Sequence, residues 1–153
     1  MRFTPWMAWL GLLAACGAPV RETPSKKPAP AVKPADESRR FPIKNRVRIE
    51  LLENQLLGRA FLPGGNLAEY RLGGRTYQQF LVRAGTADQA ALLMFDFQKT
   101  LKDARFLAHM GGYFGRDGEA PVYVFAKGVF FAGFVGLEEK QADLLAREFA
   151  ARL

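Results

Sequence analysis

Hydrophobic and polar positions along residues 41–153 follow two periods, one typical of strands and one typical of helices. Alternating or continuous apolar runs predict five strands, at residues 56–62, 67–72, 75–84, 121–127 and 129–135. Turn sequences separate neighbouring runs, at Pro63-Gly64-Gly65-Asn66, at Gly73-Gly74 and at Lys127-Gly128. We therefore expect two groups of strands, the second of which is a hairpin.

Two further segments have the helical period. Thr86 is followed three residues later by Gln89, the form of a capping box, and this predicts a helix that continues to about Lys102. A second helix begins at about Glu138 and runs to the C-terminus, with a stripe at Ala142, Leu145, Phe149 and Leu153. Residues 103–118 contain four glycines and are expected to form a loop with room for a short strand.

The order of strands, helix, strands, helix predicts an α+β domain. We expect two layers, a mainly antiparallel sheet with both helices on one face. Residues 89–97 are echoed 52 residues later by residues 141–149, since both contain Gln-Ala-x-Leu-Leu followed by Phe. A duplicated ββα unit explains this echo, and the shared composition of two helices explains it nearly as well.

The predicted hairpin is apolar on both faces. Alternation places Val122 and Val124 on one face, and it gives the other face four aromatic side chains, Tyr123, Phe125, Phe130 and Phe134. A sheet with helices on only one side is normally polar on the other. These four aromatic residues are therefore candidates for binding a ligand or a partner. The alternatives are that residues 41–57 fold over them or that the helices flank the sheet from both sides.

Residues 1–15 have the anatomy of a secretion signal. Arg2 precedes an apolar stretch of 11 residues, from Pro5 to Ala15, whereas a helix that crosses a membrane needs about 20. Small residues close this stretch and Cys16, the only cysteine of the chain, follows directly. The alternative is an ordinary signal cut after Ala15, with Cys16 a bystander.

The four residues Leu13-Ala14-Ala15-Cys16 resemble the lipobox of bacterial lipoproteins. The resemblance implies cleavage before Cys16, a diacylglyceryl group on its thiol, and a membrane anchor formed by the acyl chains. Gly17 follows the cysteine where lipoproteins kept at the inner membrane often have Asp. This similarity favours the periplasmic side of the outer membrane over the inner membrane.

Residues 16–40 are expected to be the lipidated cysteine followed by a disordered tether. The segment holds five prolines and both serines of the chain, and it has too few large apolar residues to form a core. Proline favours an extended conformation of ~3.1 Å per residue, so the tether could span roughly 70 Å. We interpret it as a spacer, either simply solvated or in contact with anionic headgroups or cell-wall polymer. Residues 41–153 then form a single globular domain.

Charge and composition exclude several functions. Six basic and three acidic residues lie in 17–40, and fifteen basic and twelve acidic residues are interspersed through 41–153, with no basic stripe of the kind that binds nucleic acid. The globular part has no serine, no cysteine and one histidine, His109, which excludes nucleophilic triads and histidine-rich zinc sites. We therefore expect neither an enzyme, nor a metal, nor a cofactor. A carboxylate-based cell-wall hydrolase stays open through Glu69, Asp96, Asp103, Asp117 and Glu119.

Residues 85–90 and 129–153 are loosely similar to a family of uncharacterised exported bacterial domains, in which a strand leads into an Ala- and Phe-rich helix and an apolar hairpin precedes a C-terminal helix. The resemblance implies a fold and no activity. The leading hypothesis is a membrane-anchored envelope lipoprotein whose domain is a non-enzymatic binding or assembly module. Its partner would be an envelope protein or a second copy of the chain. The alternative is a carrier of an apolar ligand such as a lipid.

Overall fold

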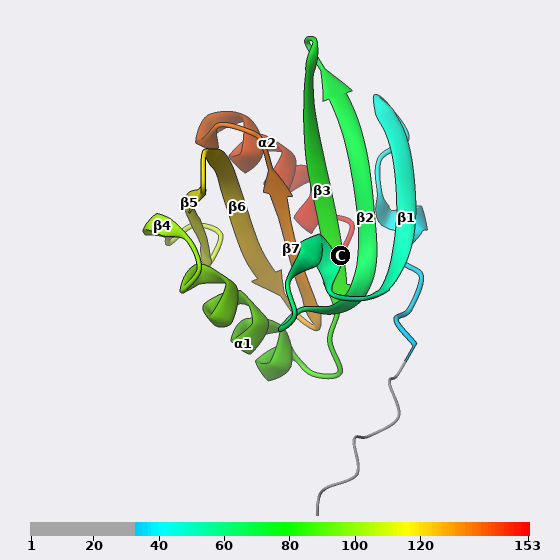
Figure 1. Cartoon of the computed structure of the whole chain (residues 1–153), viewed down its shortest axis with the longest axis vertical. Helices are drawn as coiled ribbons and strands as arrows, with labels where there is room; N and C mark the ends of the chain where they lie inside the picture. The colour runs from blue at the N-terminus through cyan, green and yellow to red at the C-terminus, as the bar shows by residue number, and fades with distance from the viewer. Residues whose placement is uncertain (1–32) are drawn as a thin grey trace, which may run out of the picture. The chain divides into compact units, whose positions relative to one another are not determined.

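The computed structural model describes residues 33–153. These form one antiparallel sheet of seven strands with two α-helices (Figure 1). The strands lie side by side in the order β1-β2-β3-β7-β6-β5-β4. Their bounds are β1 (Arg46–Asn54), β2 (Pro63–Leu72), β3 (Arg75–Arg83), β4 (Lys102–Leu107), β5 (Gly112–Asp117), β6 (Ala120–Lys127) and β7 (Phe130–Val135). The helices are α1 (Ala87–Gln98) and α2 (Glu139–Ala150), and the short 3-10 helices are η1 (Ser38–Arg40) and η2 (Leu56–Gly58). The predicted α+β class with an antiparallel sheet is confirmed.

Two parts of the sheet differ from the sequence prediction. Residues 56–62 are not a strand, because Gln55 and Leu57 have φ of 49° and 56° and the chain turns through η2 instead. The strand of this region is β1, which lies at an edge of the sheet and has only half-buried and exposed positions. Edge strands of this kind give a weak apolar signal, and this explains why β1 was not predicted.

The glycine-rich segment 103–118 contains two strands rather than a loop. Gly111 and Gly118 have positive φ and form the turns of the β4–β5 and β5–β6 hairpins. Gly112, by contrast, lies within β5, where an added Cβ would come within 2.2 Å of the Val124 carbonyl oxygen. Gly112 thus allows close approach of neighbouring backbone within a strand, and for this reason its presence did not indicate a loop.

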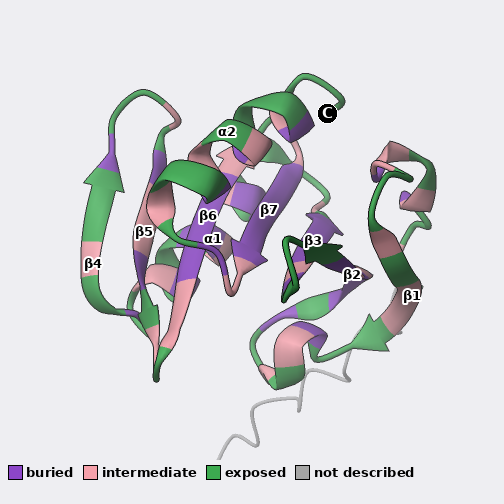
Figure 2. Cartoon of the chain, turned by 90° about the horizontal axis from the view of Figure 1, so that it is seen from above, coloured by how far each residue is buried: buried purple, intermediate pink, exposed green. Residues whose placement is uncertain are grey.

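The two helices lie on opposite faces of the sheet. Phe97 of α1 packs on Phe131, with ring centroids 5.8 Å apart, and Phe149 of α2 packs on Phe134 at 6.4 Å. Phe131 and Phe134 are three residues apart on β7 and so point to opposite faces. The structure thus has the alternative arrangement, in which helices flank the sheet from both sides, rather than both on one face. Strands β6 and β7 are buried between them, as the colouring in Figure 2 shows.

This placement also argues against a duplicated ββα unit. The order β2-β3-β7-β6 is symmetric, and β3 pairs with β7 antiparallel, so a two-fold axis perpendicular to the sheet would relate the two halves. Such an axis keeps each helix on the same face. Because α1 and α2 pack on opposite faces, the sequence echo reflects shared helix composition instead.

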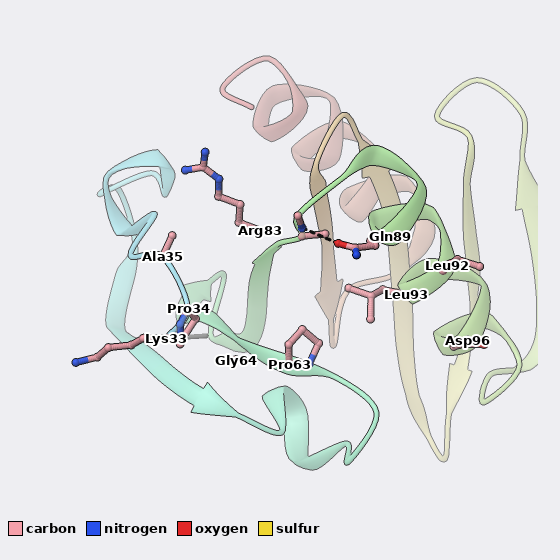
Figure 3. A pocket seen from close by; sticks show the side chains of 12 residues that line it. Lys33, Pro34, Ala35, Pro63, Gly64, Arg83, Gln89, Leu92, Leu93 and Asp96 are labelled. Atoms are coloured by element: carbon pink, nitrogen blue, oxygen red, sulfur yellow. Dashed lines mark hydrogen bonds between the residues drawn. The ribbon is translucent and has the colours of Figure 1, made fainter. Parts of the chain in front are cut away.

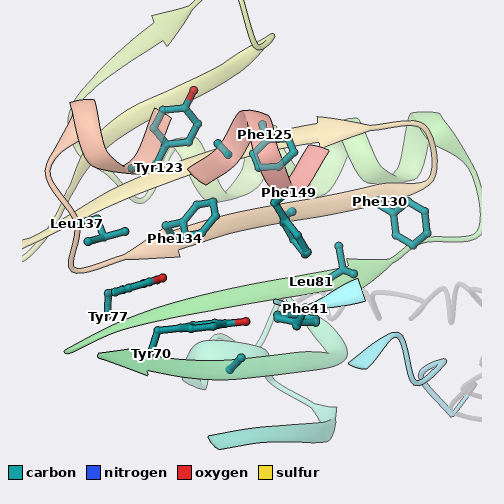
Figure 4. Packing of buried hydrophobic residues seen from close by; sticks show 14 of the residues in the cluster. Phe41, Tyr70, Tyr77, Leu81, Tyr123, Phe125, Phe130, Phe134, Leu137 and Phe149 are labelled. Atoms are coloured by element: carbon teal, nitrogen blue, oxygen red, sulfur yellow. The ribbon is translucent and has the colours of Figure 1, made fainter. Parts of the chain in front are cut away.

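The chain joins the domain earlier than the sequence predicted. Phe41 is 2% exposed and packs on Phe149 with ring centroids 5.2 Å apart (Figure 4), and Glu37, within the expected tether, is also buried. The globular part therefore includes Asp36–Arg40, and residues 33–40 are not all tether. The predicted signal at 1–15, Cys16 and the tether up to residue 32 lie outside the described residues.

Candidate functional site

The four aromatic residues that the sequence nominated for binding are buried in the core. Tyr123, Phe125, Phe130 and Phe134 are between 0% and 6% exposed, and they pack with Phe149 of α2 in one cluster (Figure 4). Helix α2 and the segment around Phe41 cover this face from within the chain. The prediction that these residues offer a binding surface is therefore wrong, and neither of the two cavities described below is lined by any of them.

A groove of about 650 Å³ lies between the start of the described chain, the sheet and α1 (Figure 3). The start of β2, the residues after β3 and the first turns of α1 form its walls. The apolar side chains that line it are Pro34, Ala35, Pro63, Ala84, Leu92 and Leu93. Lys33, Arg83 and Asp96 add charge at its edges. The volume lies within the roughly 300–1,000 Å³ that is typical of ligand sites.

Local hydrogen bonds fix the α1 side of this groove. Thr86 caps α1, because its hydroxyl oxygen accepts from the backbone N–H of Gln89 at 3.2 Å. The side chain of Gln89 accepts in turn from the backbone N–H of Gly85 at 2.9 Å (dashed in Figure 3). The predicted capping box is thus formed, except that the Gln89 side chain accepts from the N–H of Gly85, one residue before the cap, rather than from that of Thr86. It sets the angle at which α1 leaves β3 and presents Leu93 to the groove.

The outer face of α1 continues the apolar surface beyond the groove. Leu92 is 60% exposed and Phe95, one helical turn further on, is 45% exposed. Phe95 contacts Tyr113 with ring centroids 6.2 Å apart, and Tyr113 contacts Phe106 of β4 at 5.4 Å. Phe106 is itself 56% exposed. We call the groove together with Leu92, Phe95, Phe106 and Tyr113 the α1 surface.

This surface was not predicted, although the sequence contains a signal for it. The helical period places Leu93 and Phe97 on one apolar stripe of α1, and the large apolar residues Leu92 and Phe95 do not belong to that stripe. A helix that also carries large apolar residues outside its core stripe is unusual for a solvated surface. That second stripe was the available indication. The position of Phe106 in the α1 surface could not be predicted, because residues 103–118 were expected to form a loop.

An ion-pair network holds the wall of the groove next to Arg83. The buried carboxylate of Glu37 accepts from Arg40 Nε at 2.7 Å and from Arg83 Nη1 at 2.9 Å, and the backbone N–H of Glu37 donates to Asn66 Oδ1 at 2.8 Å. Burial raises the pKa of Glu37, but the hydrogen bonds and charges of the two arginines outweigh it and lower the pKa overall. Glu37 is therefore ionised at neutral pH and ties the incoming chain to β2 and β3.

His109 belongs to a second polar cluster, which centres on Asp143 of α2. The Asp143 carboxylate contacts His109 Nε2, accepts from the Tyr123 hydroxyl at 2.8 Å and pairs with Arg147 at 2.9 Å. Burial raises the pKa of Asp143, but its bonds to His109 and Tyr123 and the charge of Arg147 outweigh burial and lower the pKa overall. The cluster joins the β4–β5 turn to α2. Neither cavity includes His109 or Asp143, so we interpret the cluster as a structural clamp.

The candidate carboxylates are spread over different elements. Glu69 of β2 pairs with Arg48, Asp96 of α1 pairs with Lys99, and Asp117 at the end of β5 pairs with Arg59. Asp103 and Glu119 lie in β4 and in the β5–β6 turn. Among residues 33–153, no three His, Cys, Asp or Glu side chains are grouped as metal ligands. The same residues include no helix that is long and apolar enough to span a membrane.

Comparisons of the chain with protein-family models, with curated proteins and with solved structures find no match. The α1 surface is therefore identified by its exposure and geometry alone.

Proposed function

We propose that this chain is an envelope lipoprotein whose globular domain is a non-enzymatic module that binds a partner protein through the α1 surface. The observation that carries the proposal is the exposure of Leu92, Phe95 and Phe106 beside an apolar groove. Contiguous exposed apolar surface of this kind is uncommon on proteins that act alone, and aromatic residues are enriched where proteins meet.

The shape of this surface favours a protein over a carried lipid. A carrier shields its ligand inside an enclosed cavity, but the aromatic cluster around Phe125 and Phe134 is packed solid with α2. The groove opens to solvent, and the apolar surface extends from it across α1 to the sheet edge at Phe106. A partner protein can cover both the groove and the adjoining flat region, whereas a single acyl chain would leave much of that area exposed.

The anchor is proposed from the lipobox resemblance at Leu13-Ala14-Ala15-Cys16. Two or three acyl chains on Cys16 would hold the protein stably at a membrane, because one chain alone gives only marginal binding. We place it on the periplasmic side of the outer membrane on the basis of Gly17. The test is the intact mass of membrane-fraction protein from a bacterial host, with Cys16→Ser alongside. An unacylated, soluble product that the substitution leaves unchanged would refute the anchor.

Site-specific photo-crosslinking in the native membrane tests the binding surface. A photo-reactive phenylalanine derivative replaces Leu92 or Phe95 in the full chain, and Leu144 serves as the matched control because it is an equally exposed leucine, on α2 (61% against 60%). We expect one protein to be crosslinked from both α1 positions and not from Leu144, and the adduct to be lost when Phe106→Asp is added. Equal labelling from all three positions, or none, would refute the surface. An adduct of twice the chain mass would mean that the partner is a second copy of the chain and not a different protein.

A further inference from the structure

A second cleft lies on the opposite face of the sheet from α1. It has a volume of about 320 Å³ and is bounded by β2, β3, α2 and the segment that leads into β1. Tyr70, Tyr77 and Phe149 form its aromatic walls, and Leu145 adds an aliphatic one. The volume is at the lower end of the range typical of small-molecule sites, so only a small ligand would fit.

Gln79 is the distinctive residue of this cleft. It is 2% exposed on β3, and its register neighbours are Ala68 on β2 and Phe134 on β7, whose side chains cannot accept a hydrogen bond. Its Nε2 atom has no hydrogen-bond partner among the described residues. A buried amide without an acceptor destabilises a fold, and an apolar residue of similar volume would avoid that cost. Gln79 lines the cleft, and rotation about the last bond of its side chain, which is soft, turns the amide N–H toward a ligand there that supplies the missing acceptor.

The interior of the cleft is uncharged. Tyr70 and Tyr77 stack with ring centroids 5.2 Å apart and an angle of 11° between rings (Figure 4), and the Tyr70 hydroxyl donates to the Pro42 carbonyl oxygen at 2.8 Å. Burial raises the pKa of both phenols, and the nearby Glu148 carboxylate raises that of Tyr77 further. Both therefore stay neutral throughout the physiological range. Among the side chains of residues 33–153, the one buried donor without a partner is then the neutral amide of Gln79.

The charges of the cleft lie in Lys44, Arg152 and Glu148, two cations and one anion. This mixture gives little net attraction for an anion. An ionised carboxylate against Gln79 would lose its hydration and gain only a neutral donor, which is unfavourable. A neutral carbonyl oxygen loses less hydration and is satisfied by one good N–H donor. The cleft should therefore prefer a ligand with a neutral carbonyl oxygen over a similar ligand with an ionised carboxylate.

We propose that this cleft binds a small neutral molecule that carries a carbonyl oxygen on a short apolar body, such as an amide or an ester. The carbonyl oxygen accepts from Gln79 Nε2, and the apolar body contacts Leu145 and Phe149. The site shares no residue with the α1 surface and is independent of partner binding there.

Titration of the ¹⁵N-labelled full chain in detergent micelles with butanamide tests the site. The side-chain amide signals of Gln79 are the readout in the unmodified chain, and the backbone amide signals of Tyr77 and Phe149, which also line the cleft, are the readout that gives the affinity of every variant. Butanoate tests the preference for a neutral oxygen, and butylamine lacks a carbonyl. Gln79→Met removes the donor at nearly constant volume. Gln78→Met is the matched control, because Gln78 is the adjacent residue, points to the opposite face and does not line the cleft.

We expect saturable shifts of the Gln79 amide with butanamide, weaker shifts with butanoate and none with butylamine. Gln79→Met should weaken butanamide binding roughly fivefold to tenfold, the equivalent of one hydrogen bond, and Gln78→Met should leave it unchanged. Unchanged affinity in Gln79→Met, with its spectrum still that of a folded protein, would overturn the proposal. So would tighter binding of butanoate than of butanamide, or the absence of saturable shifts in the unmodified chain.

Discussion

Replacing Glu37 by Gln tests whether the incoming chain is fixed to the domain by charge. Glu37 is nearly fully buried and accepts hydrogen bonds from Arg40 and Arg83. Glutamine has the same shape and keeps one acceptor oxygen, but it removes the negative charge and turns the other oxygen into a donor that faces a guanidinium. The substitution therefore isolates the charge and one hydrogen bond from the packing of residues 36–41.

The expected loss of stability follows from the exposure of the partners. A hydrogen bond to a charged group contributes about 1.5–3 kcal/mol when buried, and breaking a fully buried ion pair costs about 3–5 kcal/mol. The side chains of Arg40 and Arg83 are 26% and 52% exposed, so both can recover hydration once Glu37 is gone. We therefore expect Glu37→Gln to lower the free energy of unfolding by about 1–2 kcal/mol at pH 7.

The pH dependence gives an independent check of the cause. Because the pKa of Glu37 is lower in the folded protein than its ordinary value of 4.5, its ionisation stabilises the fold above that value. The contribution is lost as the pH falls through the lowered pKa. Urea unfolding at pH 7 and at several values below 4.5, followed by circular dichroism, should show the gap between wild type and Glu37→Gln narrowing with acid.

Glu53→Gln is the control, since Glu53 is exposed and makes no ion pair among residues 33–153. It should leave the free energy of unfolding within about 0.5 kcal/mol of wild type at every pH. A gap for Glu37→Gln that stays constant from neutral to acidic pH would mean that packing, not charge, holds this segment. No gap at pH 7 would refute the network altogether.

Two further substitutions test local features of the fold. Thr86→Ala removes the cap of α1 and should lower the free energy of unfolding, measured with urea, by about 1 kcal/mol. Thr86→Ser keeps the hydroxyl and should retain most of that stability, so equal losses in both variants would contradict the capping role. Gly133→Ala places a Cβ within 2.5 Å of the Tyr123 carbonyl oxygen and 2.7 Å of the Phe80 ring. We therefore expect the free energy of unfolding to fall by about 3 kcal/mol or more. A midpoint of thermal unfolding equal to that of wild type would contradict this and show that the sheet can shift there.

The sequence predicted the elements that depend on local signals. The cap at Thr86, the strand ending near Arg83 and the hairpin at Lys127-Gly128 all lie close to where they were expected. Strand β1 and the face chosen by each helix were not predicted, because they depend on long-range packing. Alternation along β6 and β7 did show that both faces needed cover, but periodicity within a strand does not say which element provides it.

The prediction of the binding residues was wrong for a related reason. The aromatic residues Tyr123 and Phe125 were the largest apolar side chains with no assigned cover, so exposure was a reasonable interpretation of the sequence. In the structure α2 and Phe41 both pack over that face. The residues left exposed, Leu92 and Phe95, belong to a helix whose core stripe is complete without them. A surplus of apolar side chains over the requirements of the core was therefore a better indicator of exposed apolar surface than their density.

The packing of residues 36–41 on the domain links the proposed anchor to the proposed binding surface. Helix α2 lies over β6 and β7, so Leu81 and the neighbouring part of the sheet need a second cover, and Phe41 belongs to the same core cluster as both Leu81 and Phe149. Glu37 fixes that cover through Arg83, which also lines the groove beside Pro34. A partner that enters the groove therefore contacts the very segment by which the domain would be tethered. Loosening of the Glu37 network should then weaken partner binding as well as stability, which connects the pH dependence of unfolding to the crosslinking from Leu92.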